Sequence, residues 1–267
     1  MLPFFVFCRF LNLYVMLVYL SCAKLMSSAP VGRVEGAGDP LFQAQAERHV
    51  LNLMSLTIDD WSEQLHIKRE MAAEVWHMYQ HFFERKADQR LPAAFAYNGM
   101  VFRKLSAPTL TAQQLEYAQK HVLIASFLYG MLRPLDLICP YRLEGKVVLP
   151  DSGGENMFAF WKSLLTDYFI QRIKENGGVL VNLASKEMQQ MVDWRKVKKH
   201  VRVITPEFRV WKDGRLRNIV IYTKMCRGAM TRFILQRQFD DPEELKYFSF
   251  EGFQHDSESG EFFFCLK

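Results

Sequence analysis

One short segment, residues 127–144, constrains the fold more than any other part of the chain. It reads FLYGMLRPLDLICPYRLE and places Gly130, Pro134 and Pro140 among apolar residues. Glycine permits unusual backbone angles, and proline fixes φ and pushes the preceding residue toward an extended conformation. One long helix is therefore disfavoured, yet the apolar side chains have to be buried. We expect a rigid, partly buried loop.

The same segment carries side chains of opposite charge close together. These are two arginines, two carboxylates and two phenols: Arg133, Arg142, Asp136, Glu144, Tyr129 and Tyr141. Planar guanidinium groups beside carboxylates form strong, oriented hydrogen bonds. Such a set builds either a binding site or a structural ion-pair cluster, and the residues alone leave both interpretations open.

Segments typical of strands and of helices alternate along the chain. Strands are predicted at residues 16–21, 122–127, 179–183, 201–206, 218–224 and 262–266, and helices at residues 41–54, 58–65, 68–84, 111–121, 155–176 and 230–239. Asn98-Gly99 predicts a hairpin turn, and Asp213-Gly214 predicts another. No internal repeat or dinucleotide-binding glycine motif occurs. The pattern favours an α/β chain, a mixed α+β fold in one domain with a mixed central sheet surrounded by helices.

The first 26 residues are apolar enough to suggest a signal peptide or a membrane anchor. The apolar run at residues 10–22 is short for a membrane span, and no clear cleavage pattern follows it. A strand-like run starts at Met16, so we expect residues 1–15 to be an upstream extension from a misassigned start and residues 16–267 to form the domain. A membrane anchor is the alternative.

The cysteines indicate the compartment. There are five, widely scattered and without CxxC spacing. This usage indicates reduced thiols rather than a disulfide framework or a zinc ribbon. We expect a cytoplasmic protein without stable membrane association.

Positive charge is concentrated in one part of the chain. The formal net charge is only +5, but residues 194–238 contain thirteen Lys or Arg against two acids. A concentrated positive field suits phosphate-rich partners such as double-stranded DNA or another polyanion. A solvated basic face without a partner gives the same pattern.

Candidate binding residues follow three of the predicted strands. They are Lys24 after the first strand, Asn182, Ser185 and Lys186 after the strand at 179–183, and Lys224, Arg227 and Arg232 after the strand at 218–224. Anions bind where a strand runs into a helix, because backbone N–H groups are free there. Cations near a helix N-terminus are unfavourable unless an anion or a carboxylate pairs with them. Phosphate contacts, internal pairs with acids such as Glu187, and helix capping by Ser185 all stay open.

Metal and nucleophile chemistry has little support in the sequence. His77 and His81 have i, i+4 spacing, but no Cys or carboxylate at ligand spacing accompanies them. Cys226, flanked by Lys224 and Arg227, could have a lowered pKa, although a small buried residue is the simpler role. We predict no metal site, no cofactor and no catalytic residue.

A helix, a short break and a second helix are predicted over residues 58–83. Such hairpins grip DNA through main-chain N–H groups, usually with an apolar-Gly-apolar turn. Here the turn is Leu65-His66-Ile67, so histidine replaces the glycine. Any pair of antiparallel helices gives the same pattern.

Taken together, these motifs resemble the YaaA family of peroxide-stress resistance proteins. The matching motifs are residues 16–24 (MLVYLSCAK), 94–99 (AFAYNG), 128–144, 160–162 (FWK), 181–185 (VNLAS), 204–206 (ITP), 222–232 (YTKMCRGAMTR) and 251–253 (EGF). The likeness runs from Met16 to the C-terminus. It implies a cytosolic single-domain protein that limits free iron, and hence Fenton damage, and that binds double-stranded DNA through a basic cleft with a helix-hairpin-helix.

Three functional hypotheses follow. In the first, the protein is a non-catalytic DNA-binding protein whose cleft is lined by Lys24, Arg133, Arg142, Lys186, Lys224, Arg227 and Arg232, with Asp136 and Glu144 orienting the arginines. In the second, it is an enzyme that acts on a phosphorylated or nucleotide substrate in the same cleft. Direct iron chelation is the third, and the missing ligand spacing disfavours it.

Overall fold

A five-stranded mixed sheet forms the centre of the computed structural model, which describes residues 16–27, 29, 31–84 and 89–267. Its strands lie in the order β4 (Gly130–Leu132), β3 (Val122–Ser126), β1 (Met16–Ser21), β6 (Val179–Asn182) and β7 (Arg202–Ile204). β3, β1, β6 and β7 are parallel, and β4 runs antiparallel to β3. The mixed central sheet predicted from the sequence is confirmed.

Helices cover both faces of this sheet. Tyr19 of β1 packs on Phe169 of α7 (Met157–Glu175) and stacks on Trp194 of α8 (Trp194–His200). Val18 and Leu20 point to the other face and are also fully buried. A parallel strand buried on both faces has a continuous apolar sequence, which explains the run MLVYL.

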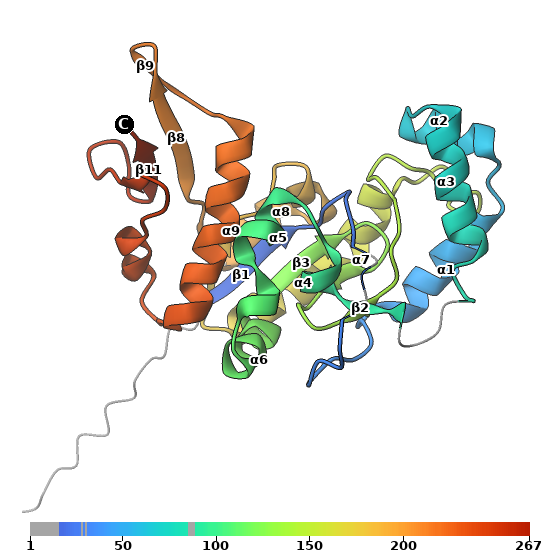
Figure 1. The fold of residues 1–267 in the computed structure, drawn as a ribbon, viewed down its shortest axis with the longest axis horizontal. Helices are drawn as coiled ribbons and strands as arrows, with labels where there is room; N and C mark the ends of the chain where they lie inside the picture. The colour runs from blue at the N-terminus through green and yellow to red at the C-terminus, as the bar shows by residue number, and fades with distance from the viewer. Residues whose placement is uncertain (1–15, 28, 30, 85–88) are drawn as a thin grey trace, which may run out of the picture.

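The remaining elements form two ends on either side of the sheet (Figure 1). One end carries a second sheet in the order β10 (Gln254–His255), β11 (Phe263–Leu266), β8 (Glu207–Lys212) and β9 (Arg215–Arg217), which packs on α9 (Val220–Arg237). The other end carries α1 (Gln43–Met54), α2 (Ile58–Leu65) and α3 (Arg69–Gln80). Smaller elements are β2 (Leu91–Pro92), β5 (Leu137–Ile138), α4 (Ala93–Ala96), α5 (Met100–Leu105), α6 (Ala112–His121) and 3-10 turns at Ala107–Thr109, Met188–Met191 and Pro242–Tyr247.

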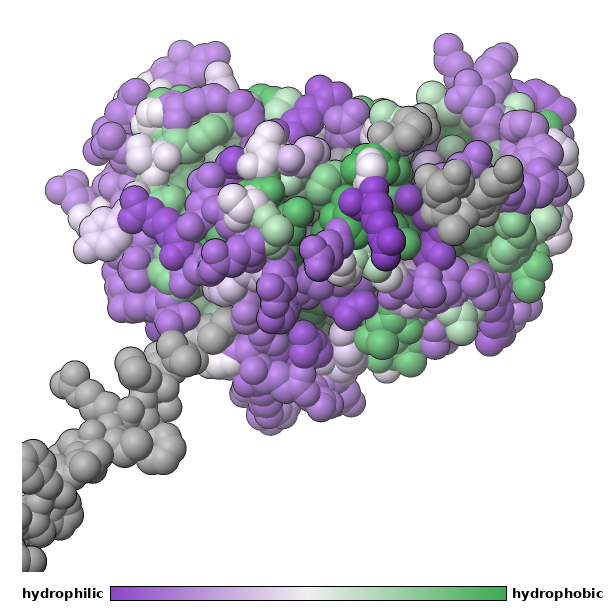
Figure 2. Space-filling model, turned by 60° about the horizontal axis from the view of Figure 1, so that its bottom comes forward, coloured by the Kyte–Doolittle hydropathy of each residue, from purple (hydrophilic) through white to green (hydrophobic). Residues whose placement is uncertain are grey.

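The surface shows no large apolar area on the face drawn in Figure 2. Hydrophilic side chains cover most of it, and apolar ones are exposed in small separate areas. Within the described residues, no helix combines the length and the apolar character needed to cross a bilayer. Residues 1–15 lie outside the described residues, so the upstream extension and the alternative anchor stay predictions.

The predicted pair of helices at residues 58–83 is present as α2 and α3. His66, at the C-cap of α2, adopts the left-handed conformation with φ 52°, which glycine favours. Thr57 and Asp60 form a capping box at the start of α2, which fixes where the helix begins. The geometry shows a hairpin of helices; that it is a DNA-gripping helix-hairpin-helix stays a prediction.

Two local predictions are wrong. Asn98-Gly99 makes no hairpin turn, because Gly99 is the N-cap of α5 and its φ is −81°. A Cβ at Gly99 would lie 2.7 Å from the Cβ of Ala23, so glycine there permits a close approach instead. Residues 218–224 form no strand: α9 begins at Val220 and runs through them. The β-branched residues there indicated a strand, but tertiary packing overrides this propensity.

Gly228 explains why α9 can lie so close to α5. A Cβ at this position would be 2.0 Å from the carbonyl oxygen of Val101 in α5. Glycine normally weakens a helix interior. Here it is required by the contact between two helices.

We therefore predict that Gly228→Ala destabilises the protein, although alanine is the better helix former. Overpacking of this kind costs about 1–3 kcal/mol. Urea unfolding followed by circular dichroism measures the change. Gly32→Ala is the matched control, because no atom lies within 4 Å of the added Cβ. A free energy of unfolding of Gly228→Ala equal to or above that of the parent would contradict the close approach of α9 to α5.

Candidate functional site

A pocket of about 410 Å³ lies at the carboxyl ends of β1, β3 and β6. Ser21 and Cys22 enter it from β1, Phe127 from β3, and Leu183 and Ser185 from β6. β1 lies between β3 and β6, because the chain adds β3 on one side of β1 and later adds β6 on the other side. Ligands of open α/β sheets bind in the crevice at such a point. Its volume is within the range of small-molecule sites.

Two further walls complete the pocket. The first wall is made by the start of α5 and by α9. α9 contributes Ile221, Lys224 and Arg227 to it. The other consists of residues 141–144, the end of the segment that constrained the fold. Four of the seven cations predicted for the site line this pocket: Lys24, Arg142, Lys224 and Arg227.

Glu144 holds two of these cations. Its Oε1 lies 2.7 Å from Lys24 Nζ and 3.6 Å from a terminal nitrogen of Arg142. The ion pair between Arg142 and Glu144 agrees with the expectation that Glu144 orients an arginine. Tyr79 also fixes this wall, since its hydroxyl donates to the carbonyl oxygen of Arg142 at 3.0 Å. Glu187 adds a second carboxylate to the lining.

Arg227 is different from the other cations. It is half-buried, and in the part of the chain that the structure describes its guanidinium has neither an ion pair nor a hydrogen bond. Burial alone lowers its pKa. Taking a charge out of water without a partner is unfavourable. Lys224, one helical turn earlier, is exposed and also forms no ion pair with any described residue. This end of the pocket therefore suits an anion.

A chain of buried hydroxyl groups supports the floor of the pocket. Tyr141 Oη lies 2.8 Å from Tyr97 Oη and 2.7 Å from Ser126 Oγ, which also accepts from the backbone N–H of Tyr129 at 3.0 Å. Burial raises the pKa of both Tyr97 and Tyr141 well above the usual value for tyrosine. The phenols stay neutral and tie residues 141–144 to the end of β3. Tyr129 Oη accepts from the N–H of Cys139 at 3.1 Å.

The residues after β6 have structural contacts. Ser185 N–H donates to Ser21 Oγ at 2.9 Å, and Ser185 Oγ accepts from the N–H of Met188 at 3.4 Å. The alternative in which Ser185 caps a helix that begins at Lys186-Glu187 is wrong, because the 3-10 turn there begins at Met188 and its N-cap is Glu187. Asn182 is buried and bonds to Thr205 Oγ1 and to the N–H of Ala184. Lys186 is exposed and does not line the pocket.

Two predicted arginines lie elsewhere. Arg133 Nε donates to Asp136 Oδ1 at 2.9 Å, and the carboxylate also accepts from the N–H of Arg133 at 2.8 Å. Asp136 is fully buried, and burial raises its pKa although Arg133 opposes the shift. Arg232 donates to the carbonyl oxygens of Leu105 and Ser106, where α5 ends. Both arginines stabilise the fold around the pocket without lining it.

The basic stretch at residues 194–238 is divided among α8, β7, the β8–β9 hairpin and α9. Several of its cations form ion pairs with acids: Lys196 with Asp167, Arg202 with Glu243 and Glu261, Arg209 with Glu207, and Arg217 with Asp213. Of the cations in this stretch, only Lys224 and Arg227 line the pocket.

Sequence reasoning missed the residues beside Lys24. Ser21, Cys22 and Gly99 line the pocket, and the only available signal was their place at the end of a predicted strand or in a turn. Cys226, by contrast, is fully buried, and burial raises its pKa to about 12. It is therefore a small core residue rather than a thiol of lowered pKa. Within the described residues, no group of three or more His, Cys, Asp or Glu could hold a metal ion.

Comparison with known proteins identifies the family. The model of the family described as "Peroxide stress protein YaaA" matches residues 16–259. The chain belongs to the YaaA family. A protein of Bacteroides thetaiotaomicron named "UPF0246 protein" is 48% identical over 241 residues, which is 90% of this chain and 93% of the relative. A Porphyromonas gingivalis protein of the same name is 44% identical, over 89% and 93%.

More distant YaaA relatives cover the chain equally well. A Janthinobacterium protein, again named "UPF0246 protein", is 36% identical over 91% of this chain and 94% of its own length. The resemblance drawn from the motifs is thus confirmed. Membership of a family of peroxide stress proteins supports a general role in the response to oxidative stress.

Cys22 provides a test of how this YaaA pocket responds to peroxide. Burial first, and Glu187 in addition, raise the pKa of its thiol to about 12. Peroxide oxidises the thiolate, not the thiol. We predict slow oxidation of Cys22 at neutral pH, with a rate that rises about tenfold per pH unit. Mass spectrometry of the Cys22 peptide after peroxide treatment measures this.

The control for Cys22 is the same protein in urea, where the thiol has an ordinary pKa of about 8.5. Faster oxidation of Cys22 in the folded protein than in urea would show instead that the pocket activates the thiol.

Proposed function

We propose that this peroxide stress protein binds double-stranded DNA, or another polyanion, through phosphate contacts at the pocket. The observation that carries the proposal is Arg227, a half-buried guanidinium without a partner among the described residues, at the end of the pocket where Lys224 also lies. A phosphate oxygen would supply the missing charge and hydrogen bonds. Arginine suits this role because its planar fork matches phosphate geometry.

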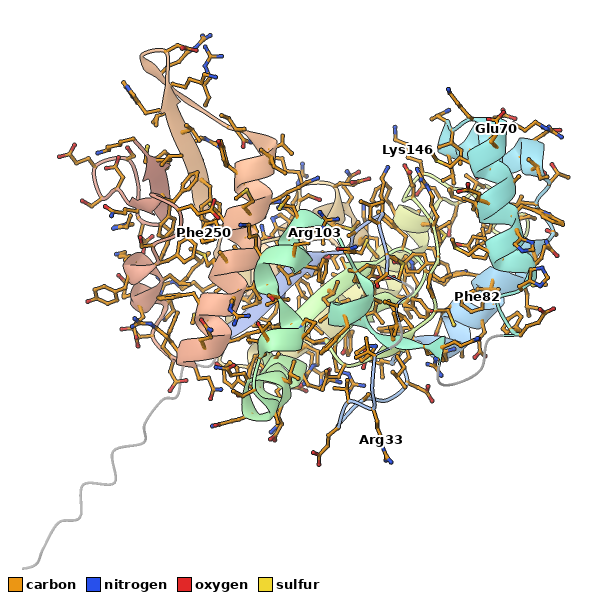
Figure 3. The ribbon with its side chains drawn as sticks, viewed as in Figure 1. Arg33, Glu70, Phe82, Arg103, Lys146 and Phe250 are labelled. Atoms are coloured by element: carbon orange, nitrogen blue, oxygen red, sulfur yellow. The ribbon has the colours of Figure 1, made fainter. Side chains whose placement is uncertain are left out.

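The shape of the molecule supports a ligand larger than the pocket. The β8–β9 hairpin and the α2–α3 hairpin project on the same side of the central sheet (Figure 1). Arg103 on α5 and Lys146 beyond residues 141–144 lie between these hairpins in the view of Figure 3. Contacts of this kind reach phosphates rather than base edges, so sequence preference is low.

Protection of DNA fits the general role of the family. The iron-driven Fenton reaction damages DNA during peroxide stress, and a protein that covers the duplex would limit that damage. The further prediction that the protein lowers free iron rests on the family resemblance alone.

The test is binding of a blunt 20-base-pair duplex across a salt series, with Arg227→Ala beside the parent protein. We expect affinity to fall steeply with salt, and the variant to bind more weakly with a log–log slope smaller by about one. The free energy of unfolding should stay equal or rise, because the variant removes an unpaired buried charge. Fluorescence anisotropy and urea unfolding measure the two quantities.

Lys199→Ala is the matched control for this test. It removes one positive charge from an exposed position on α8, away from the pocket. Equal loss of affinity in both variants would show that net charge, not the pocket, determines binding. A flat salt response of the parent would contradict phosphate binding.

An enzyme acting on a phosphorylated or nucleotide substrate is the second candidate. The observation that favours it is the pocket itself, in which Glu144 and Glu187 lie with the cations. Carboxylates beside a phosphate site can serve in acid–base catalysis.

Calorimetry with nucleoside mono- and diphosphates separates the two candidates. If these compounds bind the parent but not Arg227→Ala, and the parent does not bind duplex DNA, the enzyme is the better assignment. If they bind and compete with duplex DNA, one site serves both.

A further inference from the structure

The lining of the pocket changes character from its mouth to its interior. Leu25 and Ile221 are 64% and 45% exposed, and the cations Lys24 and Lys224 are exposed too, so these residues mark the mouth. The interior is mainly apolar, and its buried apolar side chains are Phe102, Phe127, Leu143, Leu183 and Met188. A phosphate bound at the mouth would leave this apolar interior unused.

The size of the pocket admits one small molecule and excludes a duplex. Its volume of about 410 Å³ lies near the lower end of the range for small-molecule sites. The bases of an intact duplex are stacked inside it, so only the backbone could reach the mouth. Proteins that take up a base from DNA turn it out of the stack into a closely fitting pocket. An unpaired nucleotide is the part of a nucleic acid that could occupy both mouth and interior.

Two polar groups in the lining have hydrogen-bonding capacity left. Ser185 Oγ accepts from Ser21 Oγ at 3.3 Å and from the N–H of Met188 at 3.4 Å, and its own proton has no acceptor among the described residues. The Glu187 carboxylate forms neither an ion pair nor a hydrogen bond within the described part of the chain. The edge of a base offers acceptors for the hydroxyl proton and N–H donors for the carboxylate.

An acyl chain with an anionic headgroup also combines charge with an apolar body, but it matches the lining less well. It has no hydrogen-bonding atoms along the chain, so it would cover the Ser185 hydroxyl without giving it an acceptor. It would also place hydrocarbon beside the Glu187 carboxylate. Burying polar groups without partners is unfavourable, so the lining favours a base.

Cations on both sides of the mouth could hold the neighbouring phosphates of a strand. Arg103, next to Phe102 of the lining, and Lys146, just beyond Glu144, lie between the two projecting hairpins (Figure 3). Lys146 is exposed and forms no ion pair with any described residue. The β8–β9 hairpin on one side ends in the Asp213-Gly214 turn, a prediction that φ values of 52° and 71° confirm.

We propose that the pocket binds one unpaired nucleotide, with its phosphate against Lys224 and Arg227 and its base in the interior against Phe127 and Leu183. The nucleotide is either part of a DNA strand, turned out of the stack, or a free mononucleotide, since both carry the same phosphate and base. The proposal rests on the proposed anion binding at Arg227 and names the chemical class that the pocket takes.

The experiment with DNA compares three ligands by fluorescence anisotropy. They are the 20-base-pair duplex, the same duplex with a one-nucleotide bulge, and the bulged duplex with an abasic analogue at the bulge. We expect the parent to bind the base bulge about tenfold more tightly than the paired duplex, because no base pair has to be opened. The abasic bulge keeps the charge and the flexibility of the bulge, so we expect it to bind no more tightly than the paired duplex.

Two substitutions narrow the mouth of the pocket from different sides. We expect Ile221→Trp on α9 and Leu25→Trp after β1 each to abolish the preference for the base bulge over the abasic bulge. Val220→Trp is the matched control, because Val220 is 62% exposed in the same turn of α9 and does not line the pocket. It should keep the preference. Thermal unfolding checks that each variant is folded, and narrowed variants that are folded and keep the preference would overturn the proposal.

Calorimetry tests the free nucleotide as the source. We expect a deoxynucleoside monophosphate to bind the parent about tenfold more tightly than deoxyribose 5-phosphate, because the base adds contacts with the interior. Arg227→Ala should weaken the binding of both compounds. Equal affinity for the two compounds would show that the interior does not hold the base and would overturn the proposal.

The outcomes separate this proposal from the proposed function. Binding of the paired duplex that depends on Arg227, with equal affinity for the base bulge and the abasic bulge, overturns the nucleotide pocket alone. Monophosphate binding that depends on Arg227, without binding of any duplex, supports the nucleotide pocket with a free nucleotide as its ligand and overturns DNA binding. Absence of binding to every duplex and to the monophosphate overturns both.

Discussion

The position of β1 in the central sheet is the constraint on which the rest of the structure depends. β1 lies between β3 and β6 and runs parallel to both, so the loops after these three strands diverge at one edge. The crevice between them becomes the pocket. Without this strand order, Cys22, Phe127 and Leu183 would have no reason to meet, since they are far apart in the sequence.

Two kinds of contact then hold the other walls in place. Residues 141–144 are fixed by hydrogen bonds between neutral hydroxyls, from Tyr97 through Tyr141 to Ser126. α9 is fixed by the missing side chain of Gly228, which lets it lie against α5 and sets where Lys224 and Arg227 enter the pocket. One wall of the pocket is thus fixed by buried hydrogen bonds and the other by the close packing of two helices.

Much of this was predictable from local patterns. Apolar runs located β1, β3 and β6, and the helix predicted at residues 111–121 is present as α6. Patterns failed where packing between distant segments decides: Gly99 and Gly228 serve close approaches, and neither approach is visible in the sequence. The segment at residues 127–144 illustrates both what the sequence predicted and what it did not. Its charged pairs were recognised, but only tertiary structure separates the pair that stabilises the fold, Arg133 and Asp136, from the pair at the pocket, Arg142 and Glu144.

If the pocket binds an anion as proposed, the unpaired state of Arg227 would link ligand occupancy to the lifetime of the protein. A ligand that binds only the folded chain stabilises it in proportion to the logarithm of its concentration above Kd. An empty pocket leaves a half-buried charge uncompensated, so the unliganded protein is the form that opens most readily to proteases. The amount of protein that a cell retains would then follow the supply of its anionic ligand, with no dedicated sensor.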